Sequence, residues 1–398
     1  MSDQIRDKVH QRRRRQESRR TWLRRLTACV LLGGAWLSSG CRAEQPWELW
    51  NTYANKYLDK QGRVIDHSAG DVTTSEGEAY AMFFALVAND RPHFDILVNW
   101  TEANLAQGDL TTHLPAWKWG KASDGGWHVL DPSPASDANL WMAYSLSEAG
   151  RLWKFDRYEK LGRVMAEHIA SQEIVLVPNI GPSLLPGPIG FHPNATTYYL
   201  NPSYMPPSLL AYFGDNDPVW HSVAASLPKL VVSPGGFVMD WISAGERGVA
   251  PMPAPSTLGD GKPAVPPQGS HDAIRTYLWM GIADPKTPAV RESLAAMSGM
   301  ADYLRTKPVP PRAVDAKGVV LDPDGPSGFS AAVIPYLHAL HEKKAEQEQT
   351  DRLAATKKDG LYGTSPVYYD QNLAMFSTGW QEGRYRFDEH GKLKVKWK

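Results

Sequence analysis

Apolar residues recur along most of the chain at helical spacing, and stretches rich in proline, glycine and aromatic residues separate these segments. From about residue 44 the pattern predicts about twelve helices. Their expected ranges are 47–59, 75–89, 92–107, 136–150, 154–171, 203–214, 216–230, 270–282, 287–305, 327–342, 347–356 and 365–380. Ala79–Ala88 is apolar on every side, which is typical of a helix buried all round, whereas 156–172 has a polar face.

The alternation of buried and amphipathic helices indicates an inner and an outer ring. Twelve helices in two rings make an (α/α)6 barrel, so we predict an all-α fold with one domain over residues 44–398. Short β segments are expected in the loops at Glu173–Val177 and Gly236–Ile242. The proline-rich stretch Pro251–Pro267 is interpreted as an inserted loop, and 342–358 as a charged surface helix or linker.

The first 41 residues have the composition of an export signal. Eight arginines between residues 12 and 25 precede a short apolar run, Leu26–Leu37, and small residues then lead to Cys41. The run is too short to span a bilayer comfortably, so we predict a cleaved signal peptide over 1–41 and a periplasmic or secreted protein. Ser18–Arg24 resembles a twin-arginine signal, and Sec export is the alternative. Gly40 and Cys41 suggest lipidation, although Leu37 lies one position too far upstream.

The net charge of zero hides an asymmetry. Residues 1–43 carry eleven Lys/Arg and three Asp/Glu, a net of +8, which leaves −8 for the remainder. An acidic body argues against a nucleic-acid partner. The two cysteines, Cys29 and Cys41, lie in or next to the signal, so no disulfide is expected. The histidines lack metal-ligand spacing, and we expect neither a metal nor another cofactor.

One expected helix opens with two carboxylates in the segment Thr73–Glu78. Ser75 can cap this helix, and Glu78 can complete a capping box. Glu76 is not needed for capping. At the mouth of the barrel, partial burial would raise its pKa and keep it protonated, as a proton donor requires.

Two further expected helices also start with carboxylates. In Ala135–Ala143, Ser136 or Asp137 can be the N-cap, or Asp137 can accept sugar hydroxyls. Asp272 and Arg275 lie three apart on one helix face, which fits a surface ion pair or a base kept ionised by the arginine. If the helix N-termini face one end of the barrel, the three carboxylates converge on one cleft.

Several aromatic residues fall in polar or glycine-rich loops. Trp117, Trp119 and Trp127 lie within eleven residues, and Tyr204 ends the segment Asn201–Tyr204. Tryptophan is most often a core residue. In loops of this composition, flat rings with a polar edge instead suit the faces of glucose units, so these residues are candidates for substrate binding.

These motifs resemble glycoside hydrolase family 8. Residues 135–146 resemble the family signature, with Asn139 where the family often has Asp. Residues 74–77 resemble the segment of the general acid, which implies that role for Glu76. Residues 270–275 resemble the base segment, which implies that role for Asp272, although His271 replaces the usual Tyr.

The same resemblance implies the roles of other residues. Asp137 would bind the sugar at the cleavage point, and Tyr204, in Asn201–Tyr204, would hold the attacking water. Residues 62–66, 114–120 and 328–332 are similar to a subgroup encoded with bacterial cellulose synthases. The implied protein is an inverting endo-β-1,4-glucanase with an (α/α)6 barrel, a β-1,4-glucan chain as substrate and a functional link to a cellulose synthase complex. A non-catalytic glucan-binding accessory protein, or an enzyme for chitosan, xylan or mixed-linkage glucan, is the alternative.

Overall fold

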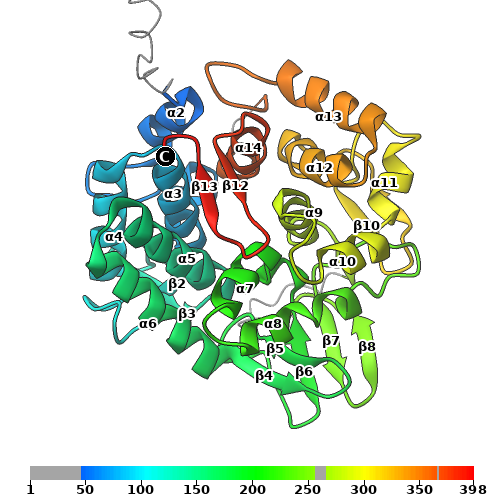
Figure 1. Ribbon diagram of the computed structural model, residues 1–398, viewed down its shortest axis with the longest axis horizontal. Coiled ribbons are helices and arrows are strands. Elements are labelled where there is room, and N and C mark those ends of the chain that lie inside the picture. The colour runs from blue at the N-terminus through cyan, green and yellow to red at the C-terminus, as the bar shows by residue number, and fades with distance from the viewer. Residues whose placement is uncertain (1–45, 256–265, 365–366) are drawn as a thin grey trace, which may run out of the picture. The chain divides into compact units, whose positions relative to one another are not determined.

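The computed structural model describes residues 46–255, 266–364 and 367–398. The expected signal peptide and most of the loop Pro251–Pro267 lie outside these residues. Six helices form an inner ring in which each packs against the next, and the last packs against the first (Figure 1). They are α3 (Ser75–Val87), α5 (Ser136–Trp153), α7 (Pro207–Gly214), α9 (Ala273–Ile282), α12 (Ser327–Ala339) and α14 (Tyr368–Gln381).

An outer layer of helices covers this ring. It consists of α2 (Glu48–Tyr57), α4 (Arg91–Asn104), α6 (Asp156–Glu173), α8 (Val219–Ala224), α10 (Val290–Ala296), α11 (Gly299–Leu304) and α13 (Lys343–Ala355). Helices α4, α6, α8, α10 and α13 each pack against the inner helix that precedes them, and α2 packs against α14. The predicted all-α fold, an (α/α)6 barrel, is confirmed, and the charged segment 342–358 is largely helix α13.

Three of the expected ranges are not continuous α-helices. The range 203–214 begins with a 3-10 turn, Pro202–Tyr204, and α7 starts only at Pro207. The range 216–230 is α8 followed by a 3-10 turn at Leu227–Leu230, since Pro228 has no N–H for an α-helical bond. The range 287–305 is split into α10 and α11 because the Gly299 N–H donates to the Gly236 carbonyl at 3.0 Å.

The described chain contains five small antiparallel sheets, four in the connections between helices and one after α14. Their strands are β1 (Thr73–Thr74), β2 (Ala116–Lys121), β3 (Trp127–Pro134), β4 (Ile174–Val177), β5 (Gly181–Leu184), β6 (Thr197–Leu200), β7 (Ile242–Gly245), β8 (Gly248–Pro251), β9 (Gln268–Gly269), β10 (Ala313–Asp315), β11 (Val320–Asp322), β12 (Tyr385–Phe387) and β13 (Leu393–Val395). The strand expected at Glu173–Val177 is confirmed as β4. The one expected at Gly236–Ile242 is wrong, because Gly236 has a φ of 68° and β7 begins only at Ile242.

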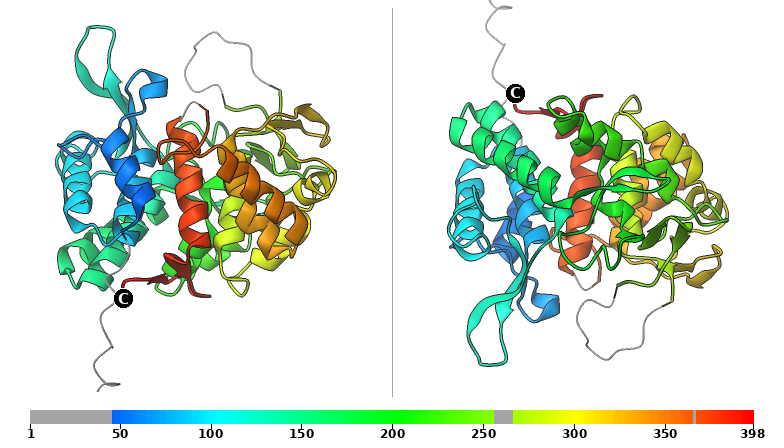
Figure 2. Two further views of the ribbon diagram at one scale, coloured as in Figure 1. Left: turned by 90° about the horizontal axis from the view of Figure 1, so that it is seen from above. Right: turned by 90° about the horizontal axis from the view of Figure 1, so that it is seen from below.

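The two ends of the barrel differ. The β2–β3 hairpin projects at one end, and β12 and β13 lie at the other (Figure 2). The β12–β13 hairpin closes its end, where Phe387 stacks on Phe83 and the Tyr144 hydroxyl donates to the Gly391 carbonyl at 2.7 Å. Between the ends, Phe376 packs against Phe83 and other inner-helix rings. With one end closed and the axis filled by aromatic rings, the end at the inner-helix N-termini is the one available for a polar site.

Candidate active site

The loop before α3 places Glu76 at the open end. Strand β1 pairs with β2 and runs directly into the helix, whose N-cap is Thr74, with its hydroxyl accepting from the Gly77 N–H at 3.2 Å. Gly77 is required because a Cβ there would lie 2.2 Å from the Tyr368 hydroxyl. The Glu76 side chain remains 19% exposed, so it faces the opening and not the core.

The predicted capping box at this helix is wrong. Ser75 is buried and its hydroxyl has no hydrogen-bond partner, so it does not cap the helix. Glu78 is fully buried and accepts from the Val64 N–H at 2.7 Å and weakly from Thr101 at 3.5 Å. Burial raises the pKa of Glu78 well above its ordinary value. Glu78 therefore fixes the loop before β1 against α3, and Glu76 is the carboxyl that faces the opening.

Asp137 enters the site from the first turn of α5. Strand β3 ends at Pro134, and the N-cap is Ala135, so the capping roles considered for Ser136 and Asp137 are wrong. Asp137 Oδ1 accepts from the Ala138 N–H at 2.8 Å, while Oδ2 lies 3.5 Å from Arg275 Nη2. Burial raises the pKa of Asp137, and Arg275 opposes that rise.

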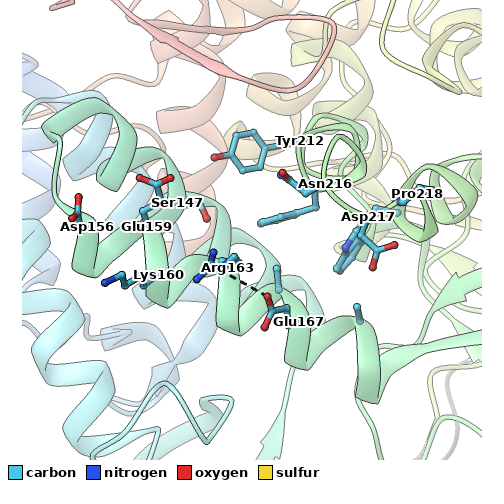
Figure 3. A pocket seen from close by; sticks show the side chains of 14 residues that line it. Ser147, Asp156, Glu159, Lys160, Arg163, Glu167, Tyr212, Asn216, Asp217 and Pro218 are labelled. Carbon is cyan, nitrogen blue, oxygen red and sulfur yellow. Dashed lines mark ion pairs between the residues drawn. The ribbon is translucent and has the colours of Figure 1, made fainter.

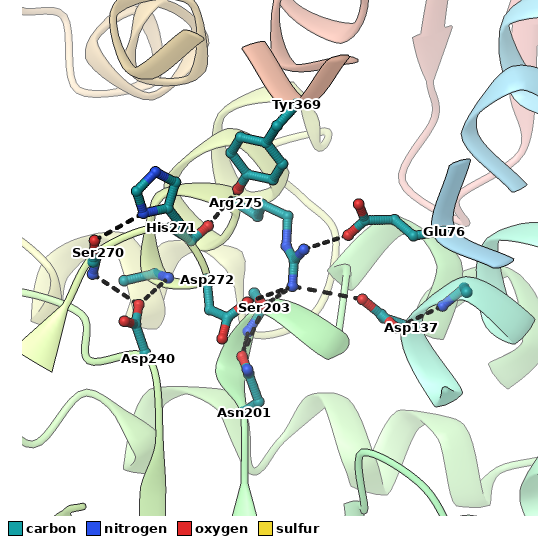
Figure 4. Close-up of polar contacts among 12 residues, drawn as sticks. Glu76, Asp137, Asn201, Ser203, Asp240, Ser270, His271, Asp272, Arg275 and Tyr369 are labelled. Carbon is teal, nitrogen blue, oxygen red and sulfur yellow. Dashed lines mark hydrogen bonds and ion pairs between the residues drawn. The ribbon is translucent and has the colours of Figure 1, made fainter. Parts of the chain in front are cut away.

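Arg275 is the centre of the polar cluster (Figure 4). Nη1 donates to Glu76 Oε2, and Nη2 donates to Asp272 Oδ1 at 2.9 Å. Nη2 also donates to the Ser203 hydroxyl at 3.0 Å. The side chain is only 6% exposed. Burial alone would lower the pKa of Arg275, but Glu76 and Asp272 raise it well above its ordinary value, so the guanidinium stays charged.

Three carboxyls therefore surround one cation. Burial raises the pKa of Glu76 to about 7, Arg275 opposes this, and Asp137 and Asp272 add to it. Tyr80, four residues further along α3, donates a hydrogen bond to Glu76 that favours the ionised form. The net effect leaves Glu76 protonated in mildly acidic solution, which is the state of a proton donor.

Residues 201–204 support the cluster from the segment before α7. Asn201 is fully buried, and its Oδ1 accepts from the Ser203 N–H at 3.0 Å and hydroxyl at 2.7 Å. Asn201 thus reaches the site through Ser203, which contacts Arg275. The Tyr204 ring lies 5.7 Å from the Arg275 guanidinium carbon and 6.3 Å from the Trp241 ring. Burial raises the pKa of Tyr204 well above its ordinary value, so its hydroxyl stays protonated.

Two of the three candidate tryptophans form a surface at the β2–β3 hairpin. The rings of Trp119 and Trp127 stack with centroids 5.4 Å apart, and Trp127 is 45% exposed. The Arg63 guanidinium lies 4.6 Å from the Trp119 ring and 4.8 Å from the Trp127 ring. Trp117 is not part of this stack; its indole N–H donates a hydrogen bond to the Asp131 carboxylate. Since β1 leads into Glu76 and β3 into Asp137, the hairpin lies beside the polar cluster.

Sequence reasoning missed several residues of this region. Tyr80 could have been found, because it lies one helical turn after Glu76. Asp240 and Tyr369 come from distant segments and carry no local signal. The Tyr369 hydroxyl donates to the His271 carbonyl, and the His271 ring packs against Phe329, with centroids 5.2 Å apart. Burial lowers the pKa of His271, so it is neutral near pH 7.

A separate hollow of about 830 Å³ lies between α6 and the α7–α8 pair (Figure 3). Charged side chains of both signs, Lys160 and Glu167 among them, line it, and none of the candidate site residues does. Within the described ranges, no group of three or more His, Cys, Asp or Glu side chains could hold a metal ion. No helix in that part of the chain is long and apolar enough to cross a membrane.

The chain is similar to characterised proteins over most of its length. Residues 24–383 match the model of "Glycosyl hydrolases family 8". An endoglucanase of Salmonella typhi is 41% identical over 375 residues, which cover 94% of this chain and 96% of that protein. The structure of an endo-1,4-D-glucanase from Vibrio fischeri has a TM-score of 0.75 at 34% identity, covering 88% of this chain and 99% of that one. The structure of endo-β-1,4-glucanase CMCax from Acetobacter xylinum has a TM-score of 0.65 at 23% identity, covering 84% of this chain and 97% of that one. At this identity the likeness shows the fold alone.

Proposed function

The chain belongs to family 8 of the glycosyl hydrolases, and we propose from this premise that Glu76 and Asp272 are the general acid and general base of its active site. The protein is an inverting endo-β-1,4-glucanase that hydrolyses internal β-1,4-glucosidic bonds of cellulose-type glucans. The observation that carries the assignment of residues is the single guanidinium of Arg275, which contacts Glu76, Asp137 and Asp272 at the open end of the barrel.

In this mechanism Glu76 protonates the leaving oxygen. Its pKa of about 7 supports the role, because the carboxyl holds its proton at mildly acidic pH. Above that pH the donor form is lost, so activity falls on the alkaline side. General acid catalysis of this kind contributes about 10²–10⁴-fold to the rate.

Asp272 activates the water on the opposite face of the sugar. The contact with Arg275 Nη2 at 2.9 Å supports this role, since the charge-assisted hydrogen bond holds the carboxyl group at the open end of the barrel. In an inverting enzyme the two carboxyls stand roughly 6.5–9.5 Å apart to leave room for the water. Tyr204, with its protonated hydroxyl beside Arg275, is the candidate for holding that water.

Asp137 and the hairpin tryptophans are proposed to hold the glucan. Asp137 contacts the same guanidinium as the acid and the base, at 3.5 Å, and accepts sugar hydroxyls at the cleavage point. Trp119 and Trp127 offer stacked, partly exposed rings beside the cluster, and Trp117 continues the same strand. Asn201 fixes Ser203, and through it the Arg275 guanidinium.

The stereochemistry of the first product tests the assignment of the base. Freshly cut cello-oligosaccharide should release the α-anomer first, and proton NMR during early hydrolysis can detect it before mutarotation. Asp272→Asn should abolish this reaction while oligosaccharide binding persists. Initial release of the β-anomer would require a covalent intermediate, with carboxyls about 5–5.5 Å apart, and would remove Asp272 as the water-activating base.

A reducing-end assay tests the substrate. Carboxymethyl cellulose is compared with chitosan, xylan and mixed-linkage glucan, and we expect cellulose-type glucan to be cut fastest. A protein that bound the glucan without cutting it would be a glucan-binding accessory protein. The set of Glu76, Asp272 and Tyr204 supports catalysis, because binding alone does not need an acid, a base and a water-holding group together.

We further propose that residues 1–41 are a cleaved export signal and that the enzyme acts in the periplasm or outside the cell, in association with a cellulose synthase complex. The basic and apolar composition of the N-terminus supports export. Mass spectrometry of protein isolated from the periplasm should show a mature chain beginning after residue 40. An N-terminus at Met1 would contradict export by cleavage, and a diacylglyceryl mass on Cys41 would identify a lipoprotein instead.

A further inference from the structure

Asp240 lies behind the proposed base, in the segment that leads into β7 (Figure 4). Its Oδ1 accepts from the Ser270 N–H at 2.7 Å and from the Ala273 N–H at 2.8 Å. These two amides stand on either side of Asp272 along the chain. Asp240 lies 30 positions before Ser270, and one of its carboxyl oxygens therefore binds the backbone on both sides of the base.

The start of α9 needs such an acceptor. The first amides of a helix have no partner within it, and a side chain at the N-cap usually supplies one. Asp272 occupies the N-cap of α9 but makes no capping hydrogen bond. With Asp240 as the acceptor, the carboxylate of Asp272 is free to face Arg275 and a water.

We propose that Asp240 is a positioning residue for the general base, holding the first turn of α9 so that Asp272 keeps its place beside Arg275. This inference rests on the proposed role of Asp272. The acceptor, Asp240, lies outside the sequence motif 270–275, so the position of the base depends on a residue outside its own helix.

The charges around Asp240 fit this role. Asp272 and Arg275 face it from α9 and Tyr369 from α14. Burial raises the pKa of Asp240 to about 7, and repulsion by Asp272 adds to the rise. Below that pH Asp240 is neutral, and its repulsion of Asp272 is removed. A neutral carboxylic acid still accepts hydrogen bonds, so the hydrogen bonds from the Ser270 and Ala273 amides persist.

Two substitutions separate geometry from charge. Asp240→Asn keeps a carbonyl oxygen at the same position, and we expect kcat within about threefold of the wild type. Asp240→Ala removes the acceptor, and kcat on cellopentaose should fall about 10- to 100-fold while KM changes less than about twofold, because a misplaced base slows the chemistry more than it weakens binding.

Asp217→Ala is the matched control. Asp217 accepts from the Val219 N–H at 3.0 Å at the start of α8, away from the cluster. It should alter thermal stability without moving kcat or the pH profile. If Asp240→Ala does not fold, Asp240→Glu takes its place. The extra methylene displaces the acceptor oxygen, so we expect the same fall in kcat.

Three results would overturn the inference. Wild-type kcat in Asp240→Ala would show that the acceptor is not needed, and equal damage in Asp240→Asn would show that charge matters instead of geometry. A loss confined to thermal stability would mean a purely structural role. Failure of the wild type to cut the oligosaccharide would contradict the proposed function itself, so the two ideas fail by different results.

Discussion

Two ion pairs with the same spacing sit at opposite ends of the inner helices. Asp272 and Arg275 lie three apart at the start of α9, and Glu148 and Arg151 lie three apart near the end of α5. Glu148 is fully buried, and each of its oxygens has a donor: Arg151 Nε at 2.7 Å and the Leu393 N–H at 2.7 Å. Arg275 instead is shared by three carboxyls.

The difference lies in how charge is balanced. At the closed end, one cation meets one carboxylate, and the Arg151 Nη2 also donates to the Leu393 carbonyl at 2.7 Å, so the pair ties β13 to the barrel. At the open end the carboxyls outnumber the cation, and burial raises the pKa values of Glu76 and Asp137. A balanced pair stabilises the fold, whereas an excess of buried carboxyls leaves one able to hold and release a proton near neutral pH.

The largest effect is expected from Glu76→Gln. The hydrolysis rate should fall about 10²–10⁴-fold, because an amide cannot donate the proton. The protein should unfold at the same or a higher temperature, since a buried carboxyl with a raised pKa is removed. Initial rates on cello-oligosaccharides and calorimetry measure both. Retained activity would show that the proton comes from another group.

Arg275→Ala should reduce the rate at the optimum about 10- to 100-fold and shift the pH profile. Arg275 lowers the pKa of Glu76, so its removal should move the alkaline limb to higher pH. The measurement is kcat/KM at a series of pH values. An alkaline limb that stays in place would mean that the guanidinium does not control the pKa of Glu76.

Arg151→Ala should break the balanced pair without touching catalysis. The free energy of unfolding should fall by on the order of 3 kcal/mol, because the carboxylate of Glu148 loses its cation while remaining buried. Urea unfolding followed by tryptophan fluorescence measures the loss, and the rate per folded molecule should not change. If Arg151→Ala slowed the enzyme and left its stability unchanged, the pair at the closed end would serve catalysis and not the stability of the fold.

The smallest effect is expected from Glu78→Gln, which also serves as the control for Glu76→Gln. The amide oxygen can still accept from the Val64 N–H, so activity should stay within about twofold and stability within ~1 kcal/mol. The same rate assay and unfolding curve apply. If Glu78→Gln lost most of its activity while Glu76→Gln stayed active, Glu78 would be the general acid and Glu76 would not.

Local pattern was enough for much of this molecule. The period of apolar residues predicted the helices and their two rings, because burial repeats along each helix. Boundaries failed where proline or a close backbone contact interrupted a helix, as at Pro228 and Gly299. The capping box failed because Glu78 found a stronger partner in the Val64 N–H, which no spacing within 73–78 could reveal.

The sequence by itself determined the fold class, the carboxylates at three helix starts and the spacing of Asp272 and Arg275, since each depends on residues within one or two helical turns. Only the tertiary structure decided that Glu76, Asp137 and Asp272 share one guanidinium and that Asp240 holds the turn of the base. Apart from the contact between Asp272 and Arg275, these contacts join residues that are 30 to 199 positions apart. A pKa depends on burial and on the charges nearby, and both are fixed only when the ring of helices closes.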